Sequence, residues 1–450
     1  MRNVHIKGAK SDRLDWFRAG VTYQIFPDRF SREESDANLE LTEWGQLPTR
    51  ENYFGGNFVG IAAKAEYLRK LGVANIYFTP IFKAPANHRY DTQDYLQLEP
   101  MLGNEVDFQN LIRKLHDIGI GVILDAVFNH SGDQFEPFKK ALGGEKALRD
   151  WFHFDGPGDE YQTVGGAQMM PQVNTANPDV KKYFIEVMNK WDSFGIKGWR
   201  LDVPWKTEIG FFEFLKKELR NNDSNRLWIS EAWWLWAFDN YSESIMNYHS
   251  RNRILDFVHR QHADAEDFVV DLLQWTSIWD DPSLILNVIG SHDTARLLNM
   301  CEGDRRDAFF CIALNMFIPG VPMLYYGDEI AMEGENDPDC RRTFPKEFSS
   351  LELEFLSQVE LFTKLRSRHR ALSHGSFDSL HLRNHALVAK RTDSDCEIYL
   401  AINTNNRVES FETNLEFDWQ VLEGQVTNSN GVIELHPKSL AIFVKQCSCK

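Results

Sequence analysis

Short apolar runs recur along the chain between residues 20 and 373, and segments with a different apolar spacing separate them. These runs are continuous rather than alternating, which is typical of strands covered on both faces. They are rich in β-branched and aromatic residues, which favour strands. The eight predicted strands are VTYQIF (21–26), ANIYFT (74–79), GVILDAVF (121–128), IKGWRLD (196–202), LWISEA (227–232), SIMNY (244–248), LILNVIGS (284–291) and VPMLYY (321–326).

The segments between these strands have a helical period. In residues 104–119 apolar side chains recur three and four positions apart, and Gly119 follows as a stop. In residues 177–195, Asn177 is a predicted N-cap and Pro178 fits the first helical turn. The predicted core stripes are Val106, Phe108, Leu111, Ile112, Leu115 and Ile118 in the first helix, and Val180, Phe184, Val187, Met188 and Trp191 in the second.

Eight strands that alternate with helices predict an α/β protein of the (β/α)₈ barrel class. The competing prediction is an open, doubly wound sheet. No GxGxxG follows the first strand, which disfavours a dinucleotide-binding sheet of that kind.

Two regions depart from the strand–helix alternation. The connection at 131–175 is too long for a simple loop and is predicted to be a small inserted domain. After residue 374 the chain has short strand-like segments with Asn, Ser and Gly turns, which predict an antiparallel β-sandwich. We therefore assign 1–130 and 176–374 to the barrel, 131–175 to the insertion and 375–450 to the C-terminal domain.

Composition narrows the classes of function. The chain has 450 residues and a formal net charge of -17, which disfavours nucleic-acid binding because phosphate contacts need a basic surface. The N-terminus has no apolar segment of a secretory signal, and no apolar run reaches the ~18 residues that a membrane span needs. Six cysteines in such a chain are expected to be reduced thiols. We therefore expect a cytoplasmic protein without a membrane partner.

Polar residues gather where the predicted strands end. Catalytic groups in barrel enzymes lie at the C-terminal ends of strands. Each of these residues has a structural alternative when taken alone, such as a buried ion pair, but their joint occurrence at one end of the barrel indicates a catalytic site. They are Asp125, Asn129 and His130 after the third strand, Arg200 and Asp202 at the fourth, Glu231 at the fifth, and His292 and Asp293 after the seventh.

Three carboxylates in this arrangement suit glycosidic chemistry, in which one carboxylate is ionised and another is protonated. Arg200 lies two residues before Asp202, on the same strand face, and is expected to lower the pKa of Asp202. Glu231 is followed by Ala232, Trp233 and Trp234, an apolar setting of the kind that keeps a general acid protonated. Asp293 is then free to hold sugar hydroxyls and to stabilise positive charge on the ring.

Four motifs resemble the α-amylase family of retaining glycoside hydrolases, namely DAVFNH (125–130), GWRLDV (198–203), ISEAW (229–233) and GSHDT (290–294). The resemblance implies that Asp202 is the nucleophile, Glu231 the acid/base and Asp293 the transition-state stabiliser. It also implies that the cleaved sugar is bound by His130, Arg200 and His292, with Tyr90 of HRYDTQDY stacked under it and Trp233 as a further contact.

Further motifs are similar to the neopullulanase/cyclomaltodextrinase subgroup, among them YQIFPDRF (23–30) and PGVPMLYYGDEIAMEGENDPDCRR (319–342). This resemblance implies that Asp337 and Arg341 contact the donor sugar and that residues 131–175 form domain B. The implied activity is hydrolysis of α-1,4-glucosidic bonds in maltooligosaccharides, cyclodextrins or related cyclic α-glucans. A transglycosidase, or a cytoplasmic α-amylase acting on larger or α-1,6-containing glucans, is the alternative.

Three departures from the subgroup pattern bear on partners and metals. The first strand begins near residue 21, which leaves no room for the N-terminal domain that builds the usual dimer, so a monomer or a different dimer is expected. The residues after Asp202 read VPWK (203–206); Trp205 is either an aromatic platform for the leaving sugar or packed under the next helix. The loop SREESDANLE (31–40) and the turn Gly55-Gly56-Asn57 offer few carboxylates to calcium. We therefore expect no required cofactor and assign no metal site, although structural calcium stays open.

The sequence disfavours two other classes of function. A non-catalytic glycan-binding barrel is disfavoured because all three carboxylates are present. A nicotinamide-dependent barrel enzyme needs a phosphate-binding signature, and none follows the seventh or eighth strand.

Overall fold

Eight parallel strands close into a barrel. The computed structural model describes residues 4–33, 40–156, 158–219, 225–233, 241–413 and 419–446. Every predicted strand segment forms one strand of this barrel, so the (β/α)₈ prediction is confirmed. In ring order the strands are β2 (Val21–Ile25), β3 (Val73–Phe78), β6 (Gly121–Ala126), β7 (Gly198–Leu201), β8 (Leu227–Ala232), β9 (Ser244–Asn247), β10 (Leu286–Val288) and β11 (Val321–Tyr325).

The strand register places the polar residues of neighbouring strands side by side. Asp125 of β6 pairs with Arg200 of β7, and Leu201 of β7 pairs with Ser230 of β8. Glu231 of β8 pairs with Met246 of β9. The carboxyl ends of β6, β7 and β8 therefore meet at one edge, as parallel strands require.

Helices surround the barrel and pack on it through the stripes that the sequence predicts. All five stripe residues of α8 (Pro178–Asp192) are buried, and the Asn177 side chain accepts hydrogen bonds from the first helical turn. In α5 (Glu105–Asp117) Asn104 forms a capping box with Asp107. Val106 in the first turn of α5 is 68% exposed, so its predicted place in the core is wrong. The other main helices are α3 (Phe58–Ala63), α4 (Ala65–Lys70), α9 (Phe211–Leu219), α10 (Tyr248–Val258), α11 (Ala265–Ser277), α13 (Arg305–Phe317) and α14 (Ser350–Arg368).

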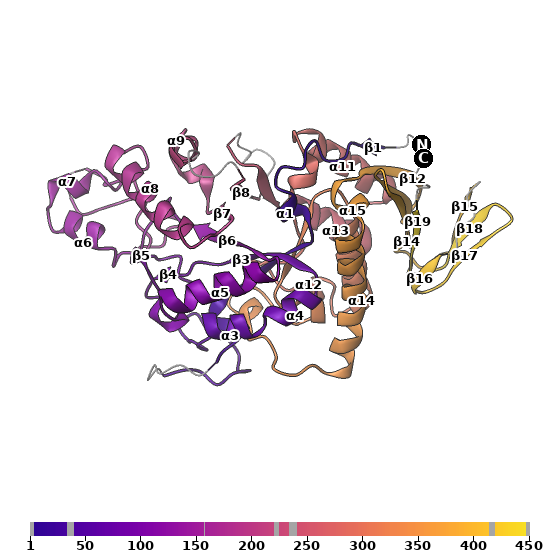
Figure 1. Ribbon diagram of the computed structural model, residues 1–450, viewed down its shortest axis with the longest axis horizontal. Coiled ribbons are helices and arrows are strands. Elements are labelled where there is room, and N and C mark those ends of the chain that lie inside the picture. The colour runs from indigo at the N-terminus through magenta and orange to yellow at the C-terminus, as the bar shows by residue number, and fades with distance from the viewer. Residues whose placement is uncertain are drawn as a thin grey trace.

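The long connection between β6 and α8 folds over its own aromatic side chains. It contains α6 (Glu136–Leu142) and α7 (Lys146–Arg149) and projects from the barrel in Figure 1. The Phe138 ring packs edge-on against Phe152 and Tyr161, each with its centroid 4.9 Å away. A β-bridge between His130 and Gln172 ties this segment to the end of β6. The segment therefore stands as a wall beside the barrel mouth.

Two antiparallel sheets follow the barrel and form the predicted sandwich. One sheet has the order β1-β12-β13-β14-β19-β16 and the other β15-β18-β17. The side chains of Val388, Ala401, Phe411, Ile433 and Leu435 pack together between the sheets. The strands are β12 (Ser376–Arg383), β13 (Ala386–Thr392), β14 (Cys396–Asn403), β15 (Glu409–Glu412), β16 (Gln420–Glu423), β17 (Val426–Ser429), β18 (Val432–Leu435) and β19 (Ser439–Gln446).

A strand from the N-terminal segment joins the C-terminal sheet. The two residues of β1 (His5–Ile6) pair with Asp378 and Phe377 of β12. A strand of two residues has no periodicity for a sequence pattern to reveal. The sequence therefore did not predict this pairing. It joins the N-terminal segment to the C-terminal sheet.

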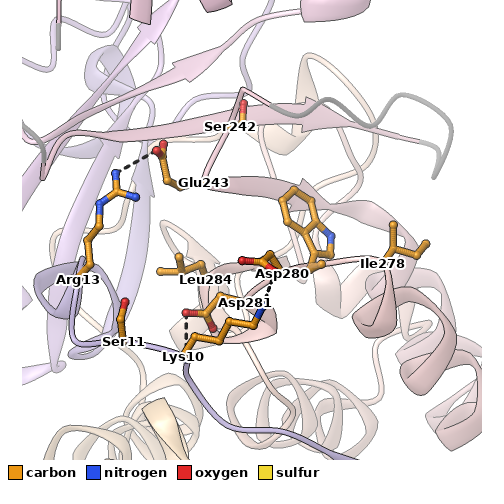
Figure 2. A pocket seen from close by; sticks show the side chains of 10 residues that line it. Lys10, Ser11, Arg13, Ser242, Glu243, Ile278, Asp280, Asp281 and Leu284 are labelled. Carbon is orange, nitrogen blue, oxygen red and sulfur yellow. Dashed lines mark hydrogen bonds and ion pairs between the residues drawn. The ribbon is translucent and has the colours of Figure 1, made fainter. Parts of the chain in front are cut away.

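The N-terminal end of the barrel carries paired charges around a hollow of about 320 Å³ (Figure 2). Residues preceding β2, β9 and β10 line this hollow. The Arg13 guanidinium lies 3.0 Å from the Glu243 carboxylate, and Lys10 pairs with Asp280 (Figure 2). Each predicted catalytic carboxylate lies at the other end of the barrel. Among the described residues, no helix is both long and apolar enough to cross a membrane.

Candidate active site

A cavity of about 450 Å³ opens at the C-terminal end of the barrel. Eight of the eleven side chains that the sequence assigns a catalytic or sugar-contacting role line it: Tyr90, His130, Asp202, Glu231, Trp233, Asp293, Asp337 and Arg341. Its other lining residues are His88, Met170 and Val203. The predicted residues Arg200 and His292 are almost fully buried beneath this lining and bond to it. The structure thus gathers ten of the eleven predicted residues in one place.

Arg200 connects the carboxylates of three strands. Its Nη1 lies 2.9 Å from Asp125 Oδ1 and 2.7 Å from Asp202 Oδ1, and its Nη2 lies 2.9 Å from Glu231 Oε2. Only 1% of the Arg200 side chain is exposed. A buried guanidinium is stable only with compensating negative charge, and the register of β6, β7 and β8 supplies it. This explains why an apolar strand carries both Arg200 and Asp202.

Asp125 acts on the site from beneath the cavity. Its Oδ2 accepts hydrogen bonds from the hydroxyls of Tyr77, at 2.6 Å, and Tyr90, at 2.9 Å. Asp125 is buried and is not part of the cavity lining. Asp125 therefore holds Arg200 and Tyr90 in position. It has the role of a buried ion-pair partner, the alternative to a catalytic role that its sequence position also allowed.

The environment of Asp202 differs from the expectation. Burial raises the pKa of Asp202 well above its usual value, the Glu231 and Asp125 carboxylates add to the rise, and Arg200 opposes it. Arg200 does lower the pKa of Asp202, as predicted, but the effect of burial is larger, so the expectation of a low pKa is wrong. Asn129 Nδ2 donates to Asp202 Oδ2 at 3.2 Å and orients the carboxylate.

Three donors surround Glu231, in place of the apolar setting that the sequence suggested. Trp233 Nε1 donates to Glu231 Oε1 at 2.6 Å, and the Val203 amide donates to Oε2 at 3.0 Å. The third donor is the Arg200 guanidinium. Trp234 lies outside the described residues. The Trp233 ring is itself stacked on Tyr248, with centroids 3.9 Å apart.

Val203 has an unfavourable backbone conformation. Its φ of 42° and ψ of 51° lie in the left-handed region, which β-branched residues rarely occupy. This conformation lets the amide that directly follows Asp202 donate to Glu231. Such strain is common where a site needs one exact orientation. The backbone thus couples the two carboxylates independently of Arg200.

His292 is held in one neutral form. Gln24 Nε2 can only donate a hydrogen bond, and it lies 2.8 Å from His292 Nδ1. His292 Nδ1 is therefore the acceptor, and the ring proton is on Nε2. His292 Nε2 lies 2.6 Å from the Tyr90 hydroxyl and 3.4 Å from Asp293 Oδ2. Burial and the charges of Arg341 and Arg200 lower the pKa of His292 well below its usual value. His292 therefore provides a fixed hydrogen-bond donor beneath the cavity.

His130 offers an acceptor to the same cavity. Its Nδ1 lies 2.8 Å from Asn129 Oδ1, which accepts the ring proton. Its Nε2 is buried, has no hydrogen-bond partner among the described residues, and belongs to a cavity-lining side chain. Burial lowers the pKa of His130 to about 4. A hydroxyl group of a bound ligand would satisfy this lone pair.

Asp337 and Arg341 extend the site beyond Asp293. Arg341 Nη1 lies 2.8 Å from Asp337 Oδ1, and its Nη2 lies 3.7 Å from Asp293 Oδ1. Arg341 Nε donates to the His292 carbonyl at 3.0 Å. Asp337 and Arg341 both follow β11, so they lie on the opposite side of the cavity from Glu231.

Trp205 is the predicted site residue that the structure does not bring into the cavity. It lies in the short helix η2 (Pro204–Lys206) and packs against the core.

The sequence missed three lining residues. His88 is the first residue of the HRYD motif and could have been found there, and Val203 directly follows Asp202. Met170 reaches the site only through the folding of the insertion, which no local pattern reveals.

Comparison with known proteins agrees with this geometry. Residues 24–357 match the family model described as "Alpha amylase, catalytic domain". A cyclomaltodextrinase from Bacillus sp. is 34% identical over 411 residues, which cover 87% of this chain and 74% of the relative. Neopullulanase 2 from Thermoactinomyces vulgaris is 34% identical over 415 residues, covering 88% of this chain and 70% of the relative.

A solved structure matches the whole fold. The ligand-free cyclic α-maltosyl-(1→6)-maltose hydrolase from Arthrobacter globiformis superposes with a TM-score of 0.88 and 29% sequence identity. The match covers 96% of this chain and 99% of that protein.

Proposed function

The chain belongs to the α-amylase catalytic-domain family, and on this premise we propose that it is a retaining hydrolase of α-1,4-glucosidic bonds. The proposed substrates are maltooligosaccharides, cyclodextrins or related cyclic α-glucans. The observation that carries the proposal is the joint contact of Arg200 with Asp202 and Glu231 at the wall of one cavity that Asp293 also lines. Two carboxylates on neighbouring strands, held by one arginine, are suited to a double-displacement reaction at the anomeric carbon of a sugar.

In the first step Asp202 attacks the anomeric carbon while Glu231 gives its proton to the glycosidic oxygen. The bond from carbon to the leaving oxygen breaks, and a covalent bond to Asp202 forms. In the second step Glu231 takes a proton from water, and the water oxygen displaces Asp202. Two inversions leave the product with the configuration of the substrate.

The other cavity groups hold the sugar while this happens. The buried Nε2 of His130 accepts a hydrogen bond from a sugar hydroxyl, and Asp293 faces the positive charge that develops on the ring. Tyr90, stacked on His292 with centroids 5.5 Å apart, gives the sugar a flat aromatic floor. Trp233, fixed by Tyr248 and Glu231, borders the leaving-group side.

The substrate panel that tests the proposal contains γ-cyclodextrin, maltotriose, pullulan, soluble starch and cyclic α-maltosyl-(1→6)-maltose. We expect ring opening of at least one cyclic glucan and release of products that are initially in the α-anomeric form. NMR of the first products measures that form. Initial β-anomers, or no cleavage of any substrate, would contradict the proposal.

The panel also addresses the alternatives. The Arthrobacter protein named for the cyclic 1→6-linked substrate is covered over 99% of its length, which supports including that class. Starch cleaved in preference to the rings would favour an α-amylase of larger substrates. Longer products that appear only when glucose is added would favour a transglycosidase.

The acid limb of the kcat/KM profile is expected well above pH 3.8, the usual pKa of an aspartate. The raised pKa of Asp202 means that this group takes up its proton at a higher pH than a solvated carboxyl does. A protonated Asp202 cannot attack, so kcat/KM falls as the pH drops through that raised value. Initial rates on γ-cyclodextrin from pH 3.5 to 8 measure the limb. A plateau that persists below pH 4 would exclude a raised pKa.

We propose that the reaction needs no metal ion, because the polar groups in the candidate calcium region already have partners. Asn57 Oδ1 accepts from the Gly60 amide at 2.8 Å, and Asn57 Nδ2 donates to the Glu33 carbonyl at 2.8 Å. Asp28 pairs with Arg29 at 2.6 Å and accepts from the Gly55 amide. The intervening residues 34–39 lie outside the described part of the chain.

Two further groups of potential ligands also have protein partners. Asn129, whose amide oxygen is of the kind that binds calcium, donates to Asp202 and accepts from His130. Asp12, Asp15 and His374 lie close enough together for an ion, but Arg18 and Arg370 neutralise their carboxylates.

Removal of divalent ions is therefore expected to leave the enzyme unchanged. After dialysis against EDTA, kcat and the thermal midpoint should stay within experimental error of the untreated protein. A fall in either value that added Ca²⁺ restores would show that a calcium site exists.

We also propose a cytoplasmic location. The buried side chains of Cys301, Cys311 and Cys340 are thiols, which suits a reducing compartment.

A further inference from the structure

Gln24 lies near the carboxyl end of β2 and is fully buried. In the barrel register it is level with Tyr77 of β3 and Tyr325 of β11. A buried carboxamide needs a partner at both ends, because each unmet polar group costs stability. Both ends of Gln24 find their partner in a single residue, His292. This pairing indicates that the glutamine acts on His292 rather than merely filling the barrel.

The main chain of His292 fixes the orientation of the Gln24 carboxamide. The His292 backbone amide can only donate, and it lies 3.3 Å from Gln24 Oε1. The carboxamide oxygen therefore faces the backbone, and the NH₂ group is left for the imidazole ring, 2.8 Å from Nδ1. The reverse orientation would set two donors against each other at the backbone. Gln24 thus always presents a hydrogen to Nδ1.

A chain of hydrogen bonds with a single direction begins at His292. Because Nδ1 accepts, Nε2 carries the ring proton and donates to the Tyr90 hydroxyl at 2.6 Å. The Tyr90 hydroxyl in turn donates to Asp125 Oδ2 at 2.9 Å. Arg200 donates to the same carboxylate, at 2.9 Å from Oδ1. Every hydrogen bond of the chain therefore points toward Asp125, the residue that holds Arg200.

The opposite tautomer of His292 would break this order at two places. With the proton on Nδ1, a bare Nε2 would accept from Tyr90, and the Tyr90 hydroxyl would turn its hydrogen away from Asp125. Nε2 also lies 3.4 Å from Asp293 Oδ2. A protonated Nε2 stabilises this carboxylate, whereas a bare one sets two acceptors against each other. The tautomer therefore decides how Tyr90 and Asp293 are held at the cavity wall.

A positive charge on the ring does not replace the tautomer. Burial lowers the pKa of His292 well below its usual value, and the nearby cations, Arg341 foremost, add to this effect. The ring is therefore neutral near pH 7, and only the choice of tautomer leaves a proton on Nε2. The titratable and charged groups around His292 are Tyr90, Asp293, Cys340, Arg341, Arg200 and His88.

We propose that Gln24 is a positioning residue for catalysis: it confines the proton of His292 to Nε2 and so orders Tyr90 and Asp293 around the reacting sugar. Gln24 does not line the cavity and acts only through His292. The inference rests on the proposed glucosidase function. It states a chemical requirement at position 24, where the side chain must offer a donor to Nδ1.

Gln24→Glu tests this requirement with almost no change in shape. One carboxyl oxygen keeps the contact with the His292 backbone amide, and the other faces Nδ1. While the new carboxyl and the ring share two protons, Nε2 keeps one of them wherever the other lies. When this pair loses a proton at higher pH, the carboxylate draws the remaining proton to Nδ1 and leaves Nε2 bare. The kcat/KM of this variant should therefore fall as the pH rises.

Gln24→Met is the matched control at the same position. Its side chain is of similar length but does not titrate, so it should lower kcat/KM by the same factor at every pH. On γ-cyclodextrin the ratio of Gln24→Glu to Gln24→Met should fall about tenfold from pH 5 to pH 9, the loss of one good polar contact. The ratio cancels the limbs that Asp202 and Glu231 give to both variants. The ratio of wild type to Gln24→Met should stay constant.

Nitrogen NMR reads the tautomer without any catalysis. In protein labelled with ¹⁵N-histidine a protonated ring nitrogen and a bare one differ in chemical shift, and the His292 signals are those that disappear in His292→Asn. Wild type is expected to show a protonated Nε2 and a bare Nδ1 from pH 5 to pH 9. In Gln24→Glu the two nitrogens should exchange these states over the pH interval in which the rate ratio falls.

The outcomes separate this inference from the function on which it rests. A wild-type ring with its proton on Nδ1 would overturn the inference, and this measurement needs no variant at position 24 to fold. A Gln24→Glu protein in which Nε2 stays protonated at pH 9, or a constant rate ratio while the proton moves, would overturn it as well. None of these results touches the glucosidase function. A wild-type protein that cleaves no substrate of the panel would overturn that function, and with it the catalytic role of Gln24, whichever tautomer NMR shows.

Discussion

Asp202→Asn is expected to lower kcat on γ-cyclodextrin by roughly 10⁴-fold, the scale seen when a nucleophilic group is removed. An amide neither attacks the anomeric carbon nor keeps the negative charge that faces the ring. The change is nearly isosteric: the amide oxygen can keep the contact with Arg200 at 2.7 Å, and only the hydrogen bond from Asn129 at 3.2 Å is lost. The fold should therefore survive, and the rate of ring opening measures the loss.

Azide tests the assigned role of Asp202 directly. In Asp202→Asn, azide attacks the anomeric carbon from the face that the carboxylate used, the bond to the leaving oxygen breaks, and a β-configured glycosyl azide forms. We expect azide to restore a measurable rate with an activated substrate such as p-nitrophenyl α-maltoside. An α-configured azide, or wild-type turnover of the variant without azide, would show that another group is the nucleophile.

Asp339→Asn is the matched control for this change. Like Asp202, Asp339 is an aspartate with an arginine partner, Arg342 at 2.7 Å, but it is only half-buried and does not line the cavity. Its amide variant should keep kcat within a few-fold of wild type.

Arg200→Met is expected to cost both activity and stability. The variant leaves the carboxylates of Asp125, Asp202 and Glu231 without their common partner. An uncompensated buried charge costs about 3–5 kcal/mol of unfolding free energy. The kcat should fall as well, because Asp202 and Glu231 lose the group that sets their separation. Urea unfolding and initial rates measure the two effects.

The stability loss in Arg200→Met should depend on pH, and its sign follows from linkage. Burial already raises the pKa of Asp125 and of Asp202 above the unfolded values, so these groups bind protons in the folded state at a higher pH than in the unfolded state. Their contribution to stability therefore decreases as the pH rises through this window. Removing Arg200 raises both pKa values further. The deficit should be largest near pH 7.5 and smaller at pH 5.

Arg226→Met is the control for this second prediction. Arg226 forms a buried pair with Asp192 at 2.8 Å, away from the cavity. It should lower stability without changing kcat. An Arg200→Met protein with the same stability deficit at both pH values would contradict the proposed role of Arg200 in compensating the carboxylates.

The elements of the fold could be predicted because each depends on local pattern. A strand buried on both faces needs a continuous apolar run, and all eight such runs became barrel strands. The α8 stripe and its Asn177 cap follow from residues within a few positions of one another. Since a barrel gathers the ends of its strands, the order of the motifs also predicted which side chains would meet.

The sequence by itself therefore determined the barrel, the inserted and C-terminal domains and the residue types at the barrel mouth. Only the tertiary structure decided how those residues behave. Burial raises the pKa of Asp202 although Arg200 adjoins it, and three donors surround Glu231 where an apolar setting was expected. The pairing of β1 with β12 and the contact of Gln24 with His292 likewise join residues far apart in the chain. Periodicity records which face of an element is buried, but desolvation and charge coupling depend on every group within a few ångströms, and the folded chain alone brings those groups together.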